Sequence, residues 1–165
     1  MNRFLIGLLL FVSVGALVQA RENLTRAKDF KGLTVTGDKI NLSDYKGQVV
    51  ILDFWASWCK PCQKEFPFLI ELYNTYYKKG LTVITVNLDE NPVNMKKFLS
   101  KLKAKVLFPL IVDKEGKIPA MYKVEAMPTT LFIDKRGMIR SRHTGFKDSH
   151  KPIYHKELQL LLAEK

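Results

Sequence analysis

The two cysteines of this 165-residue chain, Cys59 and Cys62, are the residues best suited to redox chemistry. They follow an apolar run typical of a strand and precede a segment with helical spacing. At a helix start the first sulfur lies near unpaired N–H groups and the positive end of the helix dipole, which favours its thiolate. We therefore predict that Cys59 is the nucleophile and that Cys62, one turn further and deeper, is the resolving thiol.

A structural disulfide is the plain alternative for two cysteines in an oxidising compartment. A bridge between residues three apart closes too small a loop to constrain the unfolded chain, so this spacing favours a redox-active pair. Zinc is another alternative, with His150 and His155 completing four ligands. These histidines lack the compact spacing to the cysteines that zinc fingers and ribbons show, so we expect no metal site. His143, His150 and His155 are then predicted to be surface residues.

Asp53 stands within the apolar run at residues 49–55, where an ionised carboxylate without a partner is costly to bury. Burial would raise its pKa, so that it could exchange a proton with the resolving thiol through a water molecule. The simpler interpretation is a strand-end aspartate that hydrogen-bonds the backbone. We predict the first role, as a catalytic residue.

Three neighbours of the cysteines complete the predicted active-site loop. Lys60 lies between the sulfurs, where a cation favours the thiolate, although it could equally be a solubilising residue. Pro61 fixes the first turn of the helix without leaving an N–H group unpaired. Trp58 offers a flat, partly exposed surface to a client chain.

Hydrophobic periodicity predicts a mixed α/β chain. Alternating apolar residues around Gly37 predict a β-hairpin over residues 30–44. Further strands are predicted at 49–55, 81–88, 108–112, 130–134 and 138–145. Helices are predicted from Cys62 to Tyr76 with a kink at Pro67, at 94–105 and at 153–163.

The N-terminal segment predicts export. Arg3, the apolar run at residues 4–18 and the small residue Ala20 follow the pattern of a signal peptide. An uncleaved N-terminal anchor is the alternative. We therefore expect a signal peptide or anchor at residues 1–20, a short linker at 21–29 and one folded domain at 30–165. The protein would lie in the periplasm or at the outer face of the cytoplasmic membrane.

The formal charge of +11 is spread along the chain without a recognisable nucleic-acid motif. We interpret it mainly as a solvated surface and expect no nucleic-acid partner. Weak attraction to an anionic membrane surface or to acidic partners stays open. We expect a monomer.

The chain resembles the TlpA/ResA-like thiol-disulfide oxidoreductases of the thioredoxin fold. The segment from Phe54 to Cys62 is similar to their active-site signature, and Asp53 and Pro67 stand at their buried-acid and helix-kink positions. Met127-Pro128-Thr129-Thr130 resembles their cis-proline loop. The predicted elements at 94–105 and 108–112 resemble the central α/β insertion of this branch, and the hairpin at 30–44 fits it as well.

This resemblance implies that Cys59 attacks a client disulfide and that Cys62 releases the mixed disulfide. It also implies a cis peptide at Pro128, with Met127 and Pro128 binding the client strand. It implies client proteins with disulfides, a membrane-embedded thiol electron donor, and no cofactor beyond the cysteine pair. The loop before Pro128 lacks the Gly-Val-x-Gly-x-Pro-Glu pattern of dedicated cytochrome c maturation thioredoxins, which weakens an exclusive haem-pathway assignment.

We therefore predict an exported reductase of protein disulfides, serving cytochrome c maturation or general envelope disulfide reduction. An oxidant or isomerase in the same compartment is the main alternative. A thiol peroxidase would want a threonine three residues before the reactive cysteine, where Ala56 stands. A metal carrier of this fold would favour three residues between the cysteines, and a redox-silent docking module would need neither cysteine to react.

Overall fold

A five-stranded mixed sheet forms the centre of the protein, of which this computed structural model describes residues 24–164. The strands, in the order in which they pair, are β5 (Leu110–Val112), β4 (Leu81–Asn87), β3 (Val49–Trp55), β6 (Thr129–Ile133) and β7 (Ile139–Thr144). The pairs β3–β4 and β4–β5 are parallel, whereas β3–β6 and β6–β7 are antiparallel. The predicted mixed α/β sheet is therefore confirmed.

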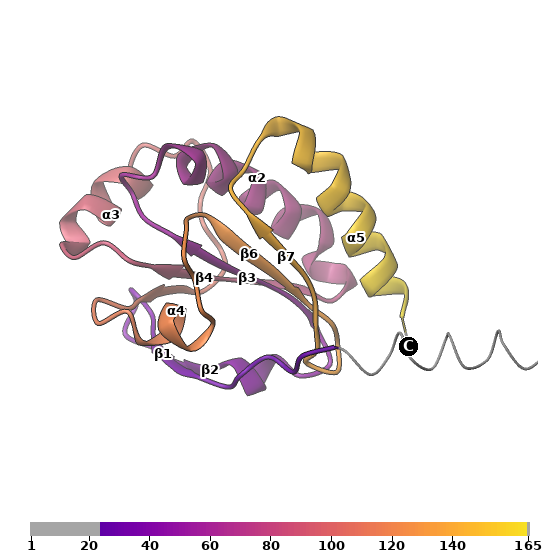
Figure 1. Cartoon of the computed structure of the whole chain (residues 1–165). Coiled ribbons are helices and arrows are strands. Elements are labelled where there is room, and N and C mark those ends of the chain that lie inside the picture. Colours follow the sequence, from indigo (N-terminus) through magenta and orange to yellow (C-terminus); the bar gives the residue numbers. More distant parts are fainter. Residues whose placement is uncertain (1–23, 165) are drawn as a thin grey trace, which may run out of the picture.

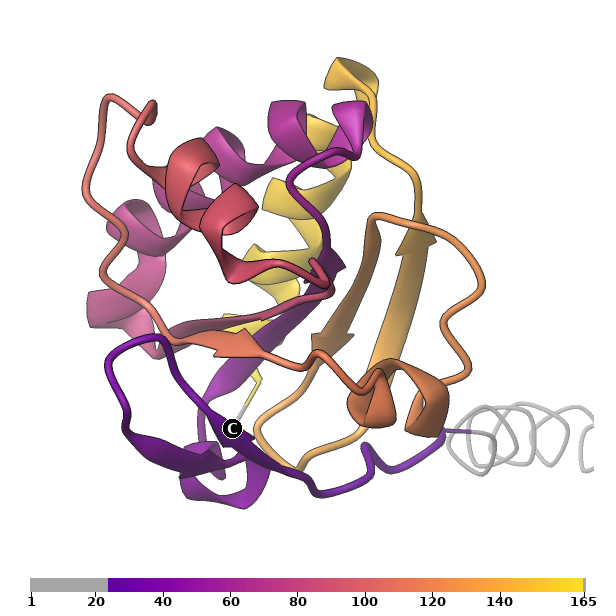
Figure 2. The same cartoon turned by 90° about the vertical axis from the view of Figure 1, so that its left-hand side faces the viewer.

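Helices cover one face of the sheet and shorter elements cover the other (Figures 1 and 2). On the first face lie α2 (Lys60–Tyr76), α3 (Pro92–Leu99) and α5 (Lys151–Ala163). On the second lie the hairpin of β1 (Lys31–Leu33) and β2 (Lys39–Asn41), and α4 (Lys117–Met121). Short 3₁₀ turns are η1 (Leu42–Tyr45), η2 (Tyr77–Lys79) and η3 (Asp148–His150).

Strand β3 is buried along its whole length because both faces of the sheet are covered. Side chains alternate between the faces of a strand. Ile51 and Trp55 thus pack in the core beneath the helices, and Leu52 and Phe54 pack in the core beneath the hairpin and α4. The continuous apolar run is explained by these two cores.

The central insertion differs from its predicted form. Helix α3 ends at Leu99 rather than near residue 105, and Ser100 caps it through a bond from its hydroxyl to the Lys97 carbonyl. A longer helix would place Lys97, Lys101 and Lys105 four residues apart on one face, where like charges repel. Helix α4 was not predicted, because five residues are too few to show helical periodicity.

The folded part of the chain extends beyond the predicted start at residue 30. Arg26 forms an antiparallel bridge with Met138, and the Tyr122 hydroxyl donates to the Lys28 carbonyl. Residues in the predicted linker therefore pack on the domain. The predicted signal peptide at 1–20 lies outside the described residues. Within residues 24–164, no helix combines the length and apolarity needed to span a bilayer.

The two outer edges of the sheet are partly covered by the N-terminal chain. At β5, Thr34 bridges Ile111, and the Val35 N–H donates to the Leu110 carbonyl. At β7, the Ile139 N–H donates to the Thr25 carbonyl. The segment at residues 25–35 thus contacts both borders of the sheet.

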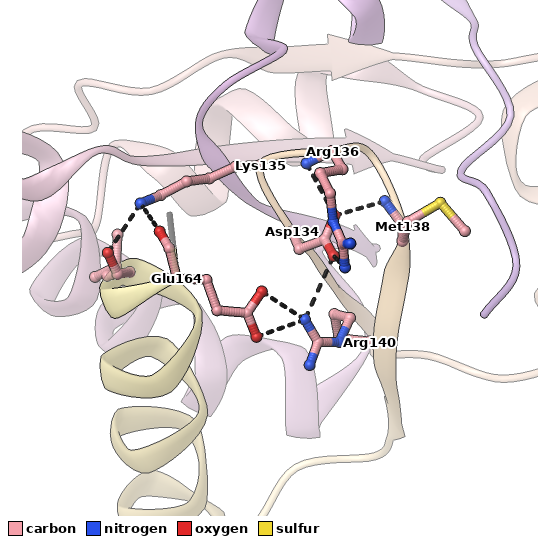
Figure 3. A network of polar contacts seen from close by, with 7 residues as sticks. Asp134, Lys135, Arg136, Met138, Arg140 and Glu164 are labelled. Carbon is pink, nitrogen blue, oxygen red and sulfur yellow. Dashed lines mark hydrogen bonds and ion pairs between the residues drawn. The ribbon is translucent and has the colours of Figure 1, made fainter. Parts of the chain in front are cut away.

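A polar network fastens the end of α5 to the β6–β7 turn, far along β6 from the end that meets the cysteine loop (Figure 3). The buried Asp134 carboxylate accepts bonds from Arg136 and Arg140, and Arg140 also pairs with Glu164. Lys135 donates to the Glu164 carbonyl at the helix end. Burial raises the pKa of Asp134, but hydrogen bonds from backbone N–H groups and Arg136 outweigh it and hold the pKa below its usual value.

Candidate active site

The two cysteines form a disulfide at the start of α2, with a Cα–Cα distance of 5.3 Å. Cys59 is the N-cap residue, and its sulfur accepts a hydrogen bond of 3.3 Å from the Cys62 N–H. Pro61 occupies the first turn, and Pro67 lies inside the helix, which continues to Tyr76. The positive end of the helix dipole therefore faces the first sulfur.

Exposure differs across this loop. Cys59 is 6% exposed and Cys62 is 1% exposed, so the first cysteine is the more accessible of the two. Trp58 is 66% exposed, and Lys60, the first residue of α2, is also exposed. A partner that approaches the disulfide would therefore meet Trp58 and Lys60 beside Cys59.

Ser57, the residue before Trp58, is held by hydrogen bonds from two elements. The Asp89 carboxylate, which is buried, accepts bonds from the N–H and the hydroxyl of Ser57 at 3.0–3.2 Å. The Gln63 side chain donates to the Ser57 carbonyl at 2.6 Å. Asn87 donates to the same Asp89 carboxylate. The loop that carries Cys59 is thus tied both to the end of β4 and to α2.

The Met127–Pro128 peptide bond is cis, as the resemblance implied. Thr129 pairs with Phe54 near the end of β3, so Pro128 lies at the sheet edge from which the cysteine loop emerges. The Pro128 carbonyl accepts the Gly145 N–H. Within the described part of the chain, no hydrogen bond engages the main-chain N–H or carbonyl of Met127. These groups are free to pair with an extended chain.

Two buried carboxyl groups meet beneath the cysteine loop. Asp53 lies on β3, and Glu65 lies on α2 three residues after Cys62, on the same buried side of the helix. The Thr130 hydroxyl is 3.1 Å from Asp53 Oδ1 and 2.9 Å from Glu65 Oε1. The Tyr154 hydroxyl donates to Glu65 Oε1 at 3.0 Å.

These contacts are best satisfied with a proton on one of the carboxyl groups. A hydroxyl carries one hydrogen, so Thr130 can donate to only one carboxylate, and its second contact needs a protonated carboxyl as donor. Burial, and then the charge of Glu65, raise the pKa of Asp53 well above its ordinary value. Burial also raises the pKa of Glu65 from 4.5 to about 7, although bonds from Thr130 and Tyr154 lower it. The pair can therefore hold or release a proton near neutral pH.

The described residues contain no group of three or more histidine, cysteine, aspartate or glutamate side chains arranged to hold a metal ion. Both sulfurs are engaged in the disulfide, and the His155 ring bonds the Tyr76 hydroxyl at 2.9 Å. The chemistry that this arrangement can perform is thiol-disulfide exchange with a proton acceptor nearby.

Comparison with known proteins gives the family. The model of the AhpC/TSA family matches residues 24–142. The chain belongs to the AhpC/TSA family. This AhpC/TSA-family protein is 38% identical to the thiol-disulfide oxidoreductase ResA of Geobacillus thermodenitrificans over 119 residues, which cover 72% of the chain and 67% of that relative.

Solved structures agree with this assignment. A Chlorobium tepidum protein described as a thiol:disulfide interchange protein of the DsbE type superposes with a TM-score of 0.80 and 37% identity, covering 85% of this chain and 97% of that one. The exposed lipoprotein thioredoxin of Streptococcus pneumoniae gives 0.70 and 34%, covering 81% and 100%. These relatives confirm a TlpA/ResA-like thioredoxin fold. The AhpC/TSA-family protein is a thiol-disulfide oxidoreductase, a class whose redox group is a cysteine pair.

The structure brings most of the predicted site residues to one edge of the sheet and corrects the histidines. Asp53 does not merely bond the backbone, because it shares the Thr130 hydroxyl with Glu65. The histidines are half-buried rather than on the surface. His143, for example, bonds Glu157 at 3.0 Å and packs against the Tyr154 ring. Aromatic contacts account for the burial of all three: His143 packs on Tyr154, His150 on Phe146, and His155 on Phe68 and Tyr76.

Sequence reasoning missed Glu65, Thr130, Tyr154 and Asp89. A signal for Glu65 was available, since it stands three residues after Cys62 in the apolar pattern that continues with Phe66 and Leu69. A carboxylate on the buried face of a helix needs the same explanation as one in a buried strand. Asp89 follows β4 in a loop and carried no comparable signal.

We predict that Glu65→Gln stabilises the protein above neutral pH. Between pH 4.5 and about 7 the unfolded chain releases a proton that native Glu65 retains, so wild-type stability falls as pH rises through this range. The variant has no such group to titrate. Its free energy of unfolding should therefore exceed that of wild type by roughly 1–3 kcal/mol at pH 8, and should not exceed it below pH 4.5. Urea unfolding across pH, with Glu71→Gln on the exposed side of α2 as control, measures it. A difference in unfolding free energy between variant and wild type that does not vary with pH would contradict the prediction.

We predict that Asp89→Ala loosens the active-site loop. The substitution leaves the buried donors of Ser57 and Asn87 without their acceptor, which costs roughly 2–4 kcal/mol of unfolding free energy. Hydrogen exchange at the Ser57 amide should rise more than exchange in β3. Asn91→Ala, which removes an exposed helix cap in the same loop, is the control. Equal exchange changes in loop and strand would show a purely global effect.

Proposed function

We propose that this protein is an exported reductase of protein disulfides, with Cys59 as nucleophile and Cys62 as resolving thiol. The observation that carries the proposal is the Cys59–Cys62 disulfide at the start of α2, with the first sulfur at the N-cap and the second more deeply buried. The Cys59 thiolate is stabilised there by the helix dipole, by the Cys62 N–H and, to a screened degree, by Lys60.

The proposed reaction moves two electrons from the reduced cysteine pair to a client. The Cys59 thiolate attacks one sulfur of the client disulfide, forming a mixed disulfide and releasing the first client thiolate. Cys62 then loses its proton and attacks the Cys59 sulfur, which closes the Cys59–Cys62 disulfide and releases the second client thiolate. A membrane-embedded thiol donor returns two electrons and regenerates the dithiol.

Asp53 is proposed to accept the proton of Cys62 through a water molecule. Glu65, which shares the Thr130 hydroxyl with Asp53, is the second carboxyl group that can hold this proton. Cys62 and Glu65 share the buried side of α2, and Glu65 and Asp53 share one hydroxyl. Raised pKa values allow one of the two groups to be a competent base near neutral pH. The same carboxyl groups disfavour a second negative charge on Cys62. The direction of electron flow is proposed from Pro61, which resembles the loops of reducing family members, whereas stabilisation of the Cys59 thiolate acts in the opposite sense and raises the reduction potential.

Client binding is assigned to Trp58, Met127 and Pro128. Trp58 is exposed beside Cys59, and the unengaged main chain of Met127 can form two hydrogen bonds with an extended client segment. The clients are proteins with disulfides, such as apocytochromes or misoxidised envelope proteins. The protein would act as a monomer in the periplasm or at the outer face of the cytoplasmic membrane. The N-terminal sequence pattern and the similarity to an exposed lipoprotein thioredoxin support export.

We predict that Cys59→Ser abolishes disulfide reduction, whereas Cys62→Ser accumulates mixed disulfides. The first variant lacks the attacking thiolate, and the second cannot resolve the intermediate. Insulin reduction and non-reducing electrophoresis after incubation with oxidised client measure the two effects. A glutathione redox titration of the wild-type protein tests the direction. A potential near that of strong oxidants, about −120 mV, would reverse the assignment to an oxidant.

We predict that Asp53→Asn slows resolution of the mixed disulfide at pH 7 by about tenfold or more. The deficit should shrink as pH rises toward 9, because Cys62 then loses its proton without a base. Stopped-flow reduction of a model disulfide between pH 6 and 9 measures it. Asp134→Asn, which alters a buried carboxylate at the other end of the sheet, is the control and should leave the rate unchanged. Identical profiles for wild type and Asp53→Asn would remove the proton-transfer role.

A further inference from the structure

The central insertion carries a dense positive charge. Residues 91–112 contain five lysines and no acidic residue. The five are all exposed and lie within a lysine segment at residues 96–105, namely Lys96, Lys97, Lys101, Lys103 and Lys105. Across residues 24–164 of the structure, none of them is engaged in an ion pair. Their charge is therefore available to a partner.

The first part of the lysine segment, at the end of α3, is anchored to the elements on either side of the redox loop. The Phe98 ring, between Lys97 and the end of α3, packs 5.3 Å from the Trp55 ring and 5.6 Å from the Phe66 ring. Trp55 ends β3 and Phe66 lies early in α2, so α3 borders the loop that joins them (Figure 1). The Asp89–Ser57 bonds tie the start of the insertion to the same loop.

One further exposed lysine adjoins Cys59. Lys60 begins α2, and Val93, 61% exposed, lies near the start of α3. Glu90, which lies just before α3, is an exposed acidic residue at the start of the insertion. A surface with clustered charge of one sign raises the local concentration of oppositely charged chains and speeds their association.

We propose that the lysine segment at 96–105 docks an acidic stretch of the client polypeptide close to its disulfide. This inference deepens the proposed function and rests on it, since the docked chain presents its disulfide to Cys59. The interaction is electrostatic, acts mainly on the association rate and weakens with salt. Clients with aspartate or glutamate near the cystine would then be reduced faster than neutral ones.

A membrane surface fits these observations less well. Helices that lie on membranes bury a broad apolar face among the lipids. In α3 that face is already occupied, because Met95 is buried in the core and Phe98 packs on Trp55 and Phe66. The exposed side offers lysine ammonium groups, which match carboxylates.

The test uses two cystine peptides of equal length, one with four glutamates and one with four glutamines flanking the disulfide. The measured quantity is the ratio of their second-order rate constants of reduction, at low and at high salt. We expect wild type to favour the acidic peptide by about tenfold at low salt and to lose this preference near 0.5 M salt. Lys96→Glu with Lys97→Glu should abolish or reverse the preference.

The matched control carries the same change of charge elsewhere. Lys31→Glu with Lys39→Glu alters two exposed lysines on the β1–β2 hairpin, on the opposite face of the sheet (Figure 2), and should keep the wild-type preference. If this control loses as much preference as the insertion variant, or if wild type shows none, the docking inference is overturned. Failure to reduce either peptide would instead refute the proposed function.

One more outcome separates a membrane from a protein partner. Wild type should not sediment with phosphatidylglycerol vesicles at the ionic strength where the peptide preference is measured. Lysine-dependent sedimentation without a peptide preference would assign the lysine segment to a membrane surface and overturn the client proposal.

Discussion

The complete burial of β3 is the constraint on which the rest of the molecule depends. Its side chains must pack into an apolar core on each side of the sheet, and this packing fixes its register with β4 and β6. That register sets the position of three things at once: the cysteine loop after Trp55, the cis-proline loop before Thr129, and the carboxyl group of Asp53. A slip by one residue would turn Asp53 toward the hairpin side and separate it from α2.

The buried carboxyl pair has an energetic cost that the surrounding core must offset. Asp53 and Glu65 lie among aromatic and aliphatic side chains, and hydroxyl groups rather than cations provide their hydrogen bonds. An arginine or lysine in this place would hold both groups ionised and lower their pKa values. Hydroxyl partners leave the proton exchangeable. The arrangement thus sacrifices some stability for a group that titrates in the working range.

Much of the fold could be predicted because its strands have clear patterns. The run at residues 49–55 gave β3 with its observed bounds, and the cis peptide at Pro128 followed from the family resemblance. Glu65 was missed because a charged residue in a helix is usually assigned to the solvent side. The apolar pattern around Glu65 indicates the buried side of α2, but its partners Thr130 and Tyr154 come from distant parts of the chain, which no local pattern encodes. The early end of α3 coincides with a cap in which the Ser100 hydroxyl bonds the Lys97 carbonyl, a contact that apolar periodicity does not show.

The coverage of the sheet borders by the N-terminal chain limits where another polypeptide can add as a strand. An uncovered outer strand is a template for unwanted pairing with other chains. Here Thr34 and Val35 occupy β5, and Thr25 and Arg26 occupy the start of β7. Any extended segment that meets the protein could otherwise pair with these edges. Partial coverage of each border leaves fewer main-chain groups in the sheet with which such segments could pair.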